Sequence, residues 1–177
     1  MLFRSPLTTL QKNKEQKKKA YAAIVVLREA GKSAHDISRL LYLVQEKLEE
    51  DIIFSYEQAI ILGDHHPYVK KFTSYPYGFR SQLAHKIRAY SFAETLIISC
   101  EVLEQAIKKD DCPSFCYLLL DGEIRNDILY SQALRKLEHL MKTYGVTVSV
   151  LSVQEHFGEG YQKLLDLCQA RGKEKLI

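Results

Sequence analysis

Three carboxylates stand close together where a predicted strand ends: Asp121, Glu123 and Asp127. Carboxylates at a strand end can hold magnesium for phosphoryl chemistry, and open α/β sheets bind ligands at the carboxyl ends of their strands. The same residues also suit a turn followed by a helix, because Asp-Gly is a turn pair and acids favour a helix start. No lysine follows at the usual short spacing. We therefore favour the turn, and Asp121 and Glu123 remain outside candidates for a metal-dependent nuclease site.

The four cysteines and the paired histidines do not form a metal-binding motif. Cys112 and Cys116 are four residues apart, and the second close pair that a zinc site needs is missing. His65 and His66 lie in the segment Gly63–Pro67, whose composition is typical of a turn. We expect reduced cysteines, no metal and no cofactor.

Motifs for nucleotide binding or nucleophilic catalysis do not occur in the sequence. Neither GxGxxG nor GxxxxGK[ST] is present, and there is no GxSxG elbow. Together with the weak carboxylate signal, this predicts a protein that is not an enzyme.

Basic residues concentrate at the N-terminus. Residues 1–19 contain six Lys or Arg side chains and one Glu, and the rest of the chain carries a small net negative charge. Such a leader can contact phosphate, although we favour the simpler interpretation of a solvated, frayed N-terminus. A later loop interleaves tyrosines with basic residues, a pattern that can stack on bases. The candidate nucleic-acid contacts are Lys12, Lys14, Lys17, Lys18, Lys19, Tyr75, Tyr77 and Arg80.

Length and composition are those of a globular protein. The chain has 177 residues, of which 46% are hydrophobic and 27% charged, so neither a collagen-like nor a disordered chain is expected. Its apolar runs are far shorter than the ~20 residues that cross a bilayer, and no secretory signal pattern follows Met1. These features predict a cytoplasmic protein without a membrane partner.

The first part of the chain reads as helical. Residues 14–30 are rich in Lys and Ala and end before Gly31. Ser33 and Asp36 have the spacing of a capping box, and an apolar stripe at helical spacing follows over residues 37–48. A third short helix is predicted over residues 56–62. The sequence thus predicts a basic flexible leader over residues 1–19 and a helical segment with a loop over residues 20–75.

The pattern changes after Gly78. Helices are predicted over residues 79–90, 101–109, 128–143 and 161–170, and strands over residues 95–99, 115–120 and 146–152. Strands separated by helices imply crossover connections and a largely parallel sheet. The predicted fold class is α/β: an N-terminal helical segment followed by a three-layer domain with a mostly parallel sheet over residues 76–177.

Four short motifs carry a family resemblance: Tyr77-Gly78, Glu94–Ser99, the valine-rich Val146–Ser152, and Gly158–Leu164. Over residues 76–170 the chain resembles the third domain of Pelota and of archaeal and eukaryotic peptide-chain release factors. The Gly-Gly-Gln motif of release factors is absent. The resemblance implies a non-catalytic adaptor in translation or ribonucleoprotein assembly. Its protein partner would be a translational GTPase or a ribosomal component, with RNA as a further partner.

A second resemblance points to a different fold. Tyr90–Glu94, Gly122–Arg125 and Gly160–Asp166 are similar to segments of translin, an all-helical oligomeric protein that binds RNA and single-stranded DNA. Ser91 would occupy the first position of an acidic pair needed for cleavage, which implies binding without catalysis. Residues 146–153 argue against this alternative, because their β-branched side chains lose freedom in a helix.

Overall fold

The computed structural model describes residues 17–29, 34–62, 68–73, 91–152 and 158–169. The strands are β1 (Lys18–Glu29), β2 (Phe54–Leu62), β3 (Tyr68–Thr73), β4 (Ser114–Gly122) and β5 (Thr147–Ser152). The helices are α2 (Ala34–Glu50), α4 (Phe92–Lys109), α5 (Ile128–Tyr144) and α6 (Glu159–Gln169).

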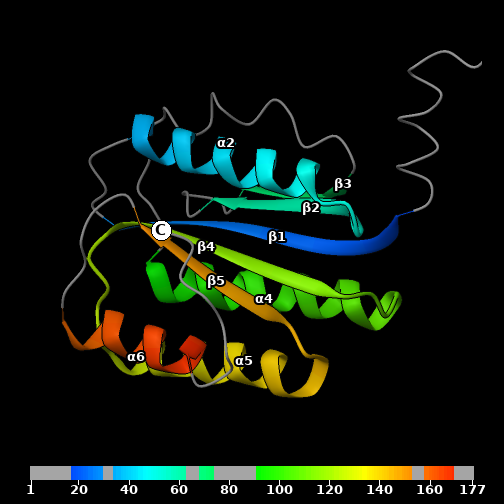
Figure 1. Cartoon of the computed structure of the whole chain (residues 1–177). Helices are drawn as coiled ribbons and strands as arrows, with labels where there is room; N and C mark the ends of the chain where they lie inside the picture. Colours follow the sequence, from blue (N-terminus) through cyan, green and yellow to red (C-terminus); the bar gives the residue numbers. More distant parts are fainter. Residues whose placement is uncertain (1–16, 30–33, 63–67, 74–90, 153–157, 170–177) are drawn as a thin grey trace, which may run out of the picture.

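The strands form one sheet in the order β3-β2-β1-β4-β5. All neighbouring strands are parallel except β3, which runs antiparallel to β2. Helix α2 lies on one face of the sheet, and α4, α5 and α6 lie on the other (Figure 1). The predicted three-layer α/β fold with a mostly parallel sheet is therefore confirmed.

The central strand β1 builds both cores. Side chains of successive strand residues point to opposite faces, so the odd-numbered residues from Tyr21 to Leu27 pack under α4, α5 and α6. The even-numbered residues from Ala22 to Val26 pack under α2. A strand buried on both faces reads as a continuous apolar run. The prediction of a helix over residues 14–30 is therefore wrong, because such a run fits a buried strand as well as a helix.

Three further element assignments differ from the sequence prediction. Residues 56–62 belong to strand β2, not to a helix. Strand β3 lies within the segment that was expected to be a loop. Residues 95–99 belong to helix α4 rather than to a strand. The reason is packing: Leu96, Cys100, Leu103 and Ile107 recur at helical spacing and are all buried against the sheet.

The remaining predicted elements are confirmed, except the helix over residues 79–90, which lies outside the described residues. The sequence located α2, β4, α5, β5 and α6 to within a few residues. The caps of α5 agree with their sequence signals: the Asp127 carboxylate accepts a 2.8 Å hydrogen bond from the backbone N–H of Tyr130. Gly145 ends the helix with a φ of 67°. The sheet joins strands from the predicted helical segment with strands from the predicted α/β domain.

Candidate binding groove

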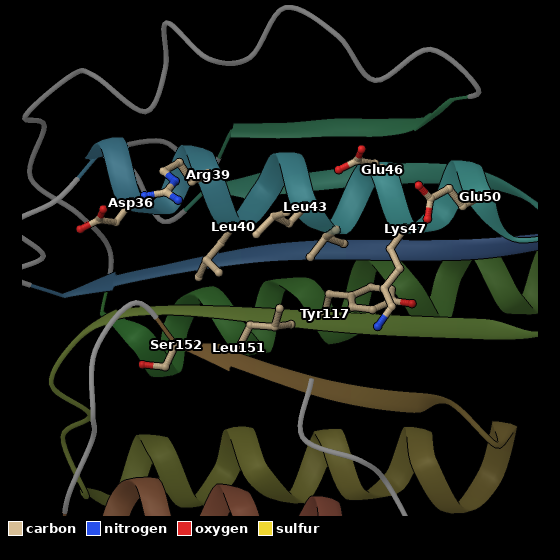
Figure 2. A pocket seen from close by; sticks show the side chains of 11 residues that line it. Asp36, Arg39, Leu40, Leu43, Glu46, Lys47, Glu50, Tyr117, Leu151 and Ser152 are labelled. Carbon is tan, nitrogen blue, oxygen red and sulfur yellow. The ribbon is translucent and has the colours of Figure 1, made fainter. Parts of the chain in front are cut away.

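A surface groove of about 620 Å³ lies between α2 and the β4–β5 half of the sheet. Figure 2 shows Leu40 and Lys47 of α2 directed across it toward the side chains of β4 and β5. On this face α2 packs against the middle of the sheet, whereas three helices pack on the opposite face. The groove is the result of this unequal cover, since α2 alone does not span the sheet to β5.

One flank of α2 forms the upper wall of the groove. Asp36, Leu40, Leu43, Lys47 and Glu50 follow one another at intervals of three or four residues and therefore lie along one side of the helix. Arg39, Val44 and Glu46 complete this wall. It thus combines an apolar centre with charged groups along its length.

The floor of the groove comes from β4 and β5. Tyr117, Leu151 and Ser152 line it, and the strand register places Tyr117 beside Ser149. Burial raises the pKa of the Tyr117 hydroxyl to about 12, so this group is neutral at physiological pH and available as a hydrogen-bond donor. The floor is therefore apolar, with hydroxyl groups at its margin.

The groove adjoins an aromatic patch made of Phe54, Tyr56 and Phe115. The ring centroids of Phe54 and Phe115 are 5.6 Å apart, and Tyr56 contacts Phe115 at the same distance. Phe115 lies two residues before Tyr117 on β4, so both side chains share one face of the sheet. The patch and the groove together form a broad half-buried apolar surface.

Large aliphatic side chains are exposed beside this surface. Leu43 on the groove wall is 54% exposed. Ile52 and Ile53, in the turn between α2 and β2, are 85% and 58% exposed. A group of exposed apolar side chains around a groove marks a contact surface more often than scattered exposed residues do.

Asp51 holds the turn that carries these isoleucines. Its carboxylate accepts hydrogen bonds from the backbone N–H groups of Ile53 (2.8 Å) and Phe54 (3.0 Å) and from the Tyr56 hydroxyl (2.6 Å). Burial raises the pKa of this carboxyl, but these hydrogen bonds outweigh it, so the pKa lies below its ordinary value. The turn and the aromatic patch are thereby fixed relative to each other.

The structure separates the three carboxylates that suggested a metal site. Asp121 is buried within β4, Glu123 is exposed after the strand, and Asp127 caps α5. Within the described residues no group of three His, Cys, Asp or Glu side chains is placed to hold a metal ion. The structure confirms Asp127 as a helix cap, but the expected Asp-Gly turn is wrong, because Asp121 and Gly122 are the last residues of β4.

Only some of the predicted nucleic-acid contacts fall within the described residues. Lys17 precedes β1, while Lys18 and Lys19 are its first residues and are exposed. The Lys19 ammonium donates a 2.7 Å hydrogen bond to Asp110 and lies 3.7 Å from Glu57, so its charge is partly balanced. Outside the described residues lie Lys12, Lys14, Tyr75, Tyr77 and Arg80. The structure does not bring Lys17, Lys18 and Lys19 into the groove.

All four cysteines are free, as the sequence predicted. Cys100, Cys116 and Cys168 are buried, and Cys112 is half-buried. Burial raises the pKa of Cys100 to about 12 and that of Cys168 to about 11. These thiols therefore behave as small apolar core residues.

The sequence interpretation did not identify the groove. Leu43 lies beside the apolar stripe of α2 rather than on it, and an off-stripe leucine is a signal that could have been noticed. Tyr117 and Leu151 carried no such signal, because their positions on the same face depend on the β4–β5 register.

Comparisons with known proteins identify the fold. No protein-family model and no curated protein matches the chain. Among solved structures, the SpRpn10 VWA domain has a TM-score of 0.56 and 14% identity, covering 86% of this chain and 82% of that chain. Proximal thread matrix protein 1 from the mussel byssus has a TM-score of 0.57 and 11% identity. That match covers 86% of this chain but 41% of the byssus protein. At these identities the likeness shows a von Willebrand A (VWA)-like fold.

Both family resemblances drawn from the sequence are therefore wrong. The structural neighbours have a VWA-like fold, not the fold of the Pelota third domain or of translin. The Pelota-like interpretation needed a strand at Glu94–Ser99, but these residues lie in α4. The translin-like interpretation needed an all-helical chain, which the five-stranded sheet contradicts.

No described helix has the length and apolar character needed to cross a membrane.

Proposed function

We propose that the chain is a non-catalytic protein-binding domain and that the groove between α2 and β4–β5 is its docking surface. The observation that carries this proposal is the apolar groove, with Leu43 exposed on its wall and charged side chains around its rim. An apolar centre with a polar rim is the usual anatomy of a protein interface. VWA-like folds commonly serve as protein-interaction domains, an analogy that agrees with the groove but does not assign the function.

The groove is the feature that supports a protein as the partner. A translation-related partner followed from the Pelota resemblance, and no contact in the described residues supports it. RNA binding through the basic leader stays a prediction, as does a cytoplasmic location. A nuclease site at Asp121 and Glu123 has no support from the structure, because the two residues differ in burial and sit in different local environments.

Site-specific photo-crosslinking in the cells that express the protein tests the proposal. A photoreactive phenylalanine analogue replaces Leu43 in one variant and Ile128 in the other. Ile128 is the matched control because it is 78% exposed at the start of α5, on the opposite side of the sheet. We expect the Leu43 position, but not the Ile128 position, to crosslink to a defined protein.

The crosslinked protein is then purified and titrated against Leu43→Glu and Ile128→Glu variants. A charge in an apolar contact region disrupts binding, so Leu43→Glu should weaken affinity by at least ~10-fold, equivalent to about 1.4 kcal/mol. Ile128→Glu should bind like the wild type. Equal affinities for the two variants, or equal crosslinking at both positions, would show that the groove is not the docking surface.

A further inference from the structure

Strand β5 is an edge of the sheet. Among the described strands, only β4 pairs with it. From Val148 to Leu151, no backbone hydrogen bond joins the outer edge of the strand to another described part of the chain. A parallel strand directs the N–H and C=O groups of alternate residues to opposite sides. The outer edge of β5 therefore presents a row of backbone donors and acceptors that can pair with another extended chain.

The two edges of the sheet differ in composition. The opposite edge strand, β3, contains Lys70 and Lys71 in a six-residue strand. Lysines on an edge strand are a common protection against unwanted pairing. Strand β5 reads Thr-Val-Ser-Val-Leu-Ser and contains no charged residue, proline or glycine. Its sequence thus lacks the features that would discourage strand addition.

The free edge and the groove are continuous. Leu151 and Ser152 belong to β5 and also line the groove. Ser149 is paired in register with Tyr117, and Leu151 with Leu119, so these β5 side chains lie on the groove face of the sheet. A strand paired with β5 would lie about 4.8 Å away. It would direct every second side chain over the groove toward Leu43.

Unpaired acidic groups stand at one end of the groove. Glu46 and Glu50 are exposed and form no ion pair within the described residues. They lie in the last turns of α2, where the helix dipole adds negative potential. Lys47 lies between them in the sequence and extends across the groove toward Tyr117 (Figure 2), so two carboxylates and one ammonium group line this end and its net charge is negative. A cationic side chain on the occupant would be favoured at this end.

Resting on the proposed function, we propose that the occupant is an extended peptide segment of a partner protein, which adds to β5 as a further strand. Its backbone pairs with the outer edge of Val148–Leu151. Its alternate side chains are apolar and contact the groove at Leu43 and Leu151. A Lys or Arg near one end of the segment lies beside Glu46 and Glu50. Backbone pairing supplies the affinity, and the groove supplies the specificity.

Selection from a display library of random octapeptides on the full chain provides the probe. We expect enriched peptides to carry apolar residues at alternate positions and a basic residue near one end. The strongest binder is then made synthetically in two N-methylated forms, each blocking one alternate set of backbone N–H groups. The form methylated on the set that faces β5 should bind at least ~100-fold more weakly, and the other form should bind like the parent peptide.

Amide hydrogen exchange measured residue by residue adds a second readout. In the free chain, only alternate amides of Val148–Leu151 should exchange slowly, through pairing with β4. Saturating peptide should slow the remaining amides by at least ~100-fold. Ser149→Lys should weaken peptide binding at least ~10-fold, because it places a charge on the groove face of the edge strand, under the apolar side chains of the added strand. Gln132→Lys, an exposed position on α5, is the matched charge control and should have no effect.

Four results would overturn the strand addition. The first is that selection enriches no peptide with apolar residues at alternate positions. If both N-methylated peptides bind like the parent peptide and the exchange of the β5 amides does not change, the peptide docks through its side chains alone. That result overturns the strand addition but leaves the proposed groove function intact. Slow exchange at the outer edge in the dilute free chain would show that the chain itself covers β5. Protection that rises with protein concentration would identify a second copy as the occupant. Loss of crosslinking at Leu43, by contrast, removes the proposed function itself.

Discussion

The Tyr130 hydroxyl donates a buried hydrogen bond of 2.6 Å to the backbone carbonyl of Gly160, and this bond joins α5 to α6. Tyr130 is fully buried, and its ring packs edge-on against Phe92 of α4 with centroids 5.8 Å apart. One side chain thus connects the three helices on this face of the sheet.

Tyr130→Phe is expected to lower the free energy of unfolding by about 0.5–1.5 kcal/mol, because the buried hydrogen bond to the Gly160 carbonyl is lost. Denaturant unfolding should show a lower midpoint with an unchanged slope. Tyr144→Phe is the control, since the Tyr144 ring is half-buried and its hydroxyl donates no hydrogen bond to another described residue. A midpoint unchanged by Tyr130→Phe would show that this hydrogen bond does not stabilise the fold.

Gly160→Ala is expected to destabilise the protein although alanine favours helices. A Cβ at this position would lie 2.8 Å from Cγ2 of Ile124 and 3.1 Å from its backbone oxygen. The clash should cost about 1–3 kcal/mol, more than the ~1 kcal/mol by which alanine is preferred to glycine within a helix. Thermal unfolding measures the net loss. Combining Gly160→Ala with Ile124→Ala should restore part of it, and strict additivity of the two losses would argue against the clash.

Asp51→Asn is expected to reduce stability at pH 7 and to flatten its pH dependence in acid. The folded-state pKa of Asp51 is depressed, so its contribution is complete above the unfolded value of about 3.9. The contribution of the ionised Asp51 carboxylate to the free energy of unfolding is lost as the pH falls through the lower folded-state pKa. Urea unfolding measured from pH 7 to pH 3 should show that the free energy of unfolding falls more steeply with decreasing pH in the wild type than in Asp51→Asn. Asp111→Asn, at an exposed position, is the control, and parallel curves for wild type and Asp51→Asn would contradict the prediction.

Thiol reactivity should follow burial. At pH 8 we expect Cys112 to react first with a disulfide reagent, because it is the half-buried cysteine. Burial raises the pKa of all four thiols, so the difference in rate comes from access: Cys112 is half-buried, whereas the other three thiols are enclosed in the core. Mass spectrometry of the native protein should find one fast site, and denaturant should release all four. Fast native modification of Cys116 would contradict the packing described for β4.

Local patterns in the sequence were sufficient for several elements. The stripe from Ile37 to Leu48 predicted α2, and the alternation of valines with polar residues predicted β5. Asp127 and Gly145 marked both ends of α5. These signals succeed because caps and one-sided burial are encoded by neighbouring residues.

The sequence by itself thus determined the α/β class, the parallel crossover from β4 through α5 to β5, and both caps of α5. Tertiary structure alone decided that Ala20–Leu27 is a central strand, since a segment buried on every side loses its periodicity. It also decided that Thr95–Ser99 is helical, because burial of one face of α4 outweighs the modest strand preference of β-branched residues. The groove, too, was decided by the tertiary structure. Leu43, Tyr117 and Leu151 meet only because strand order and register bring α2, β4 and β5 together.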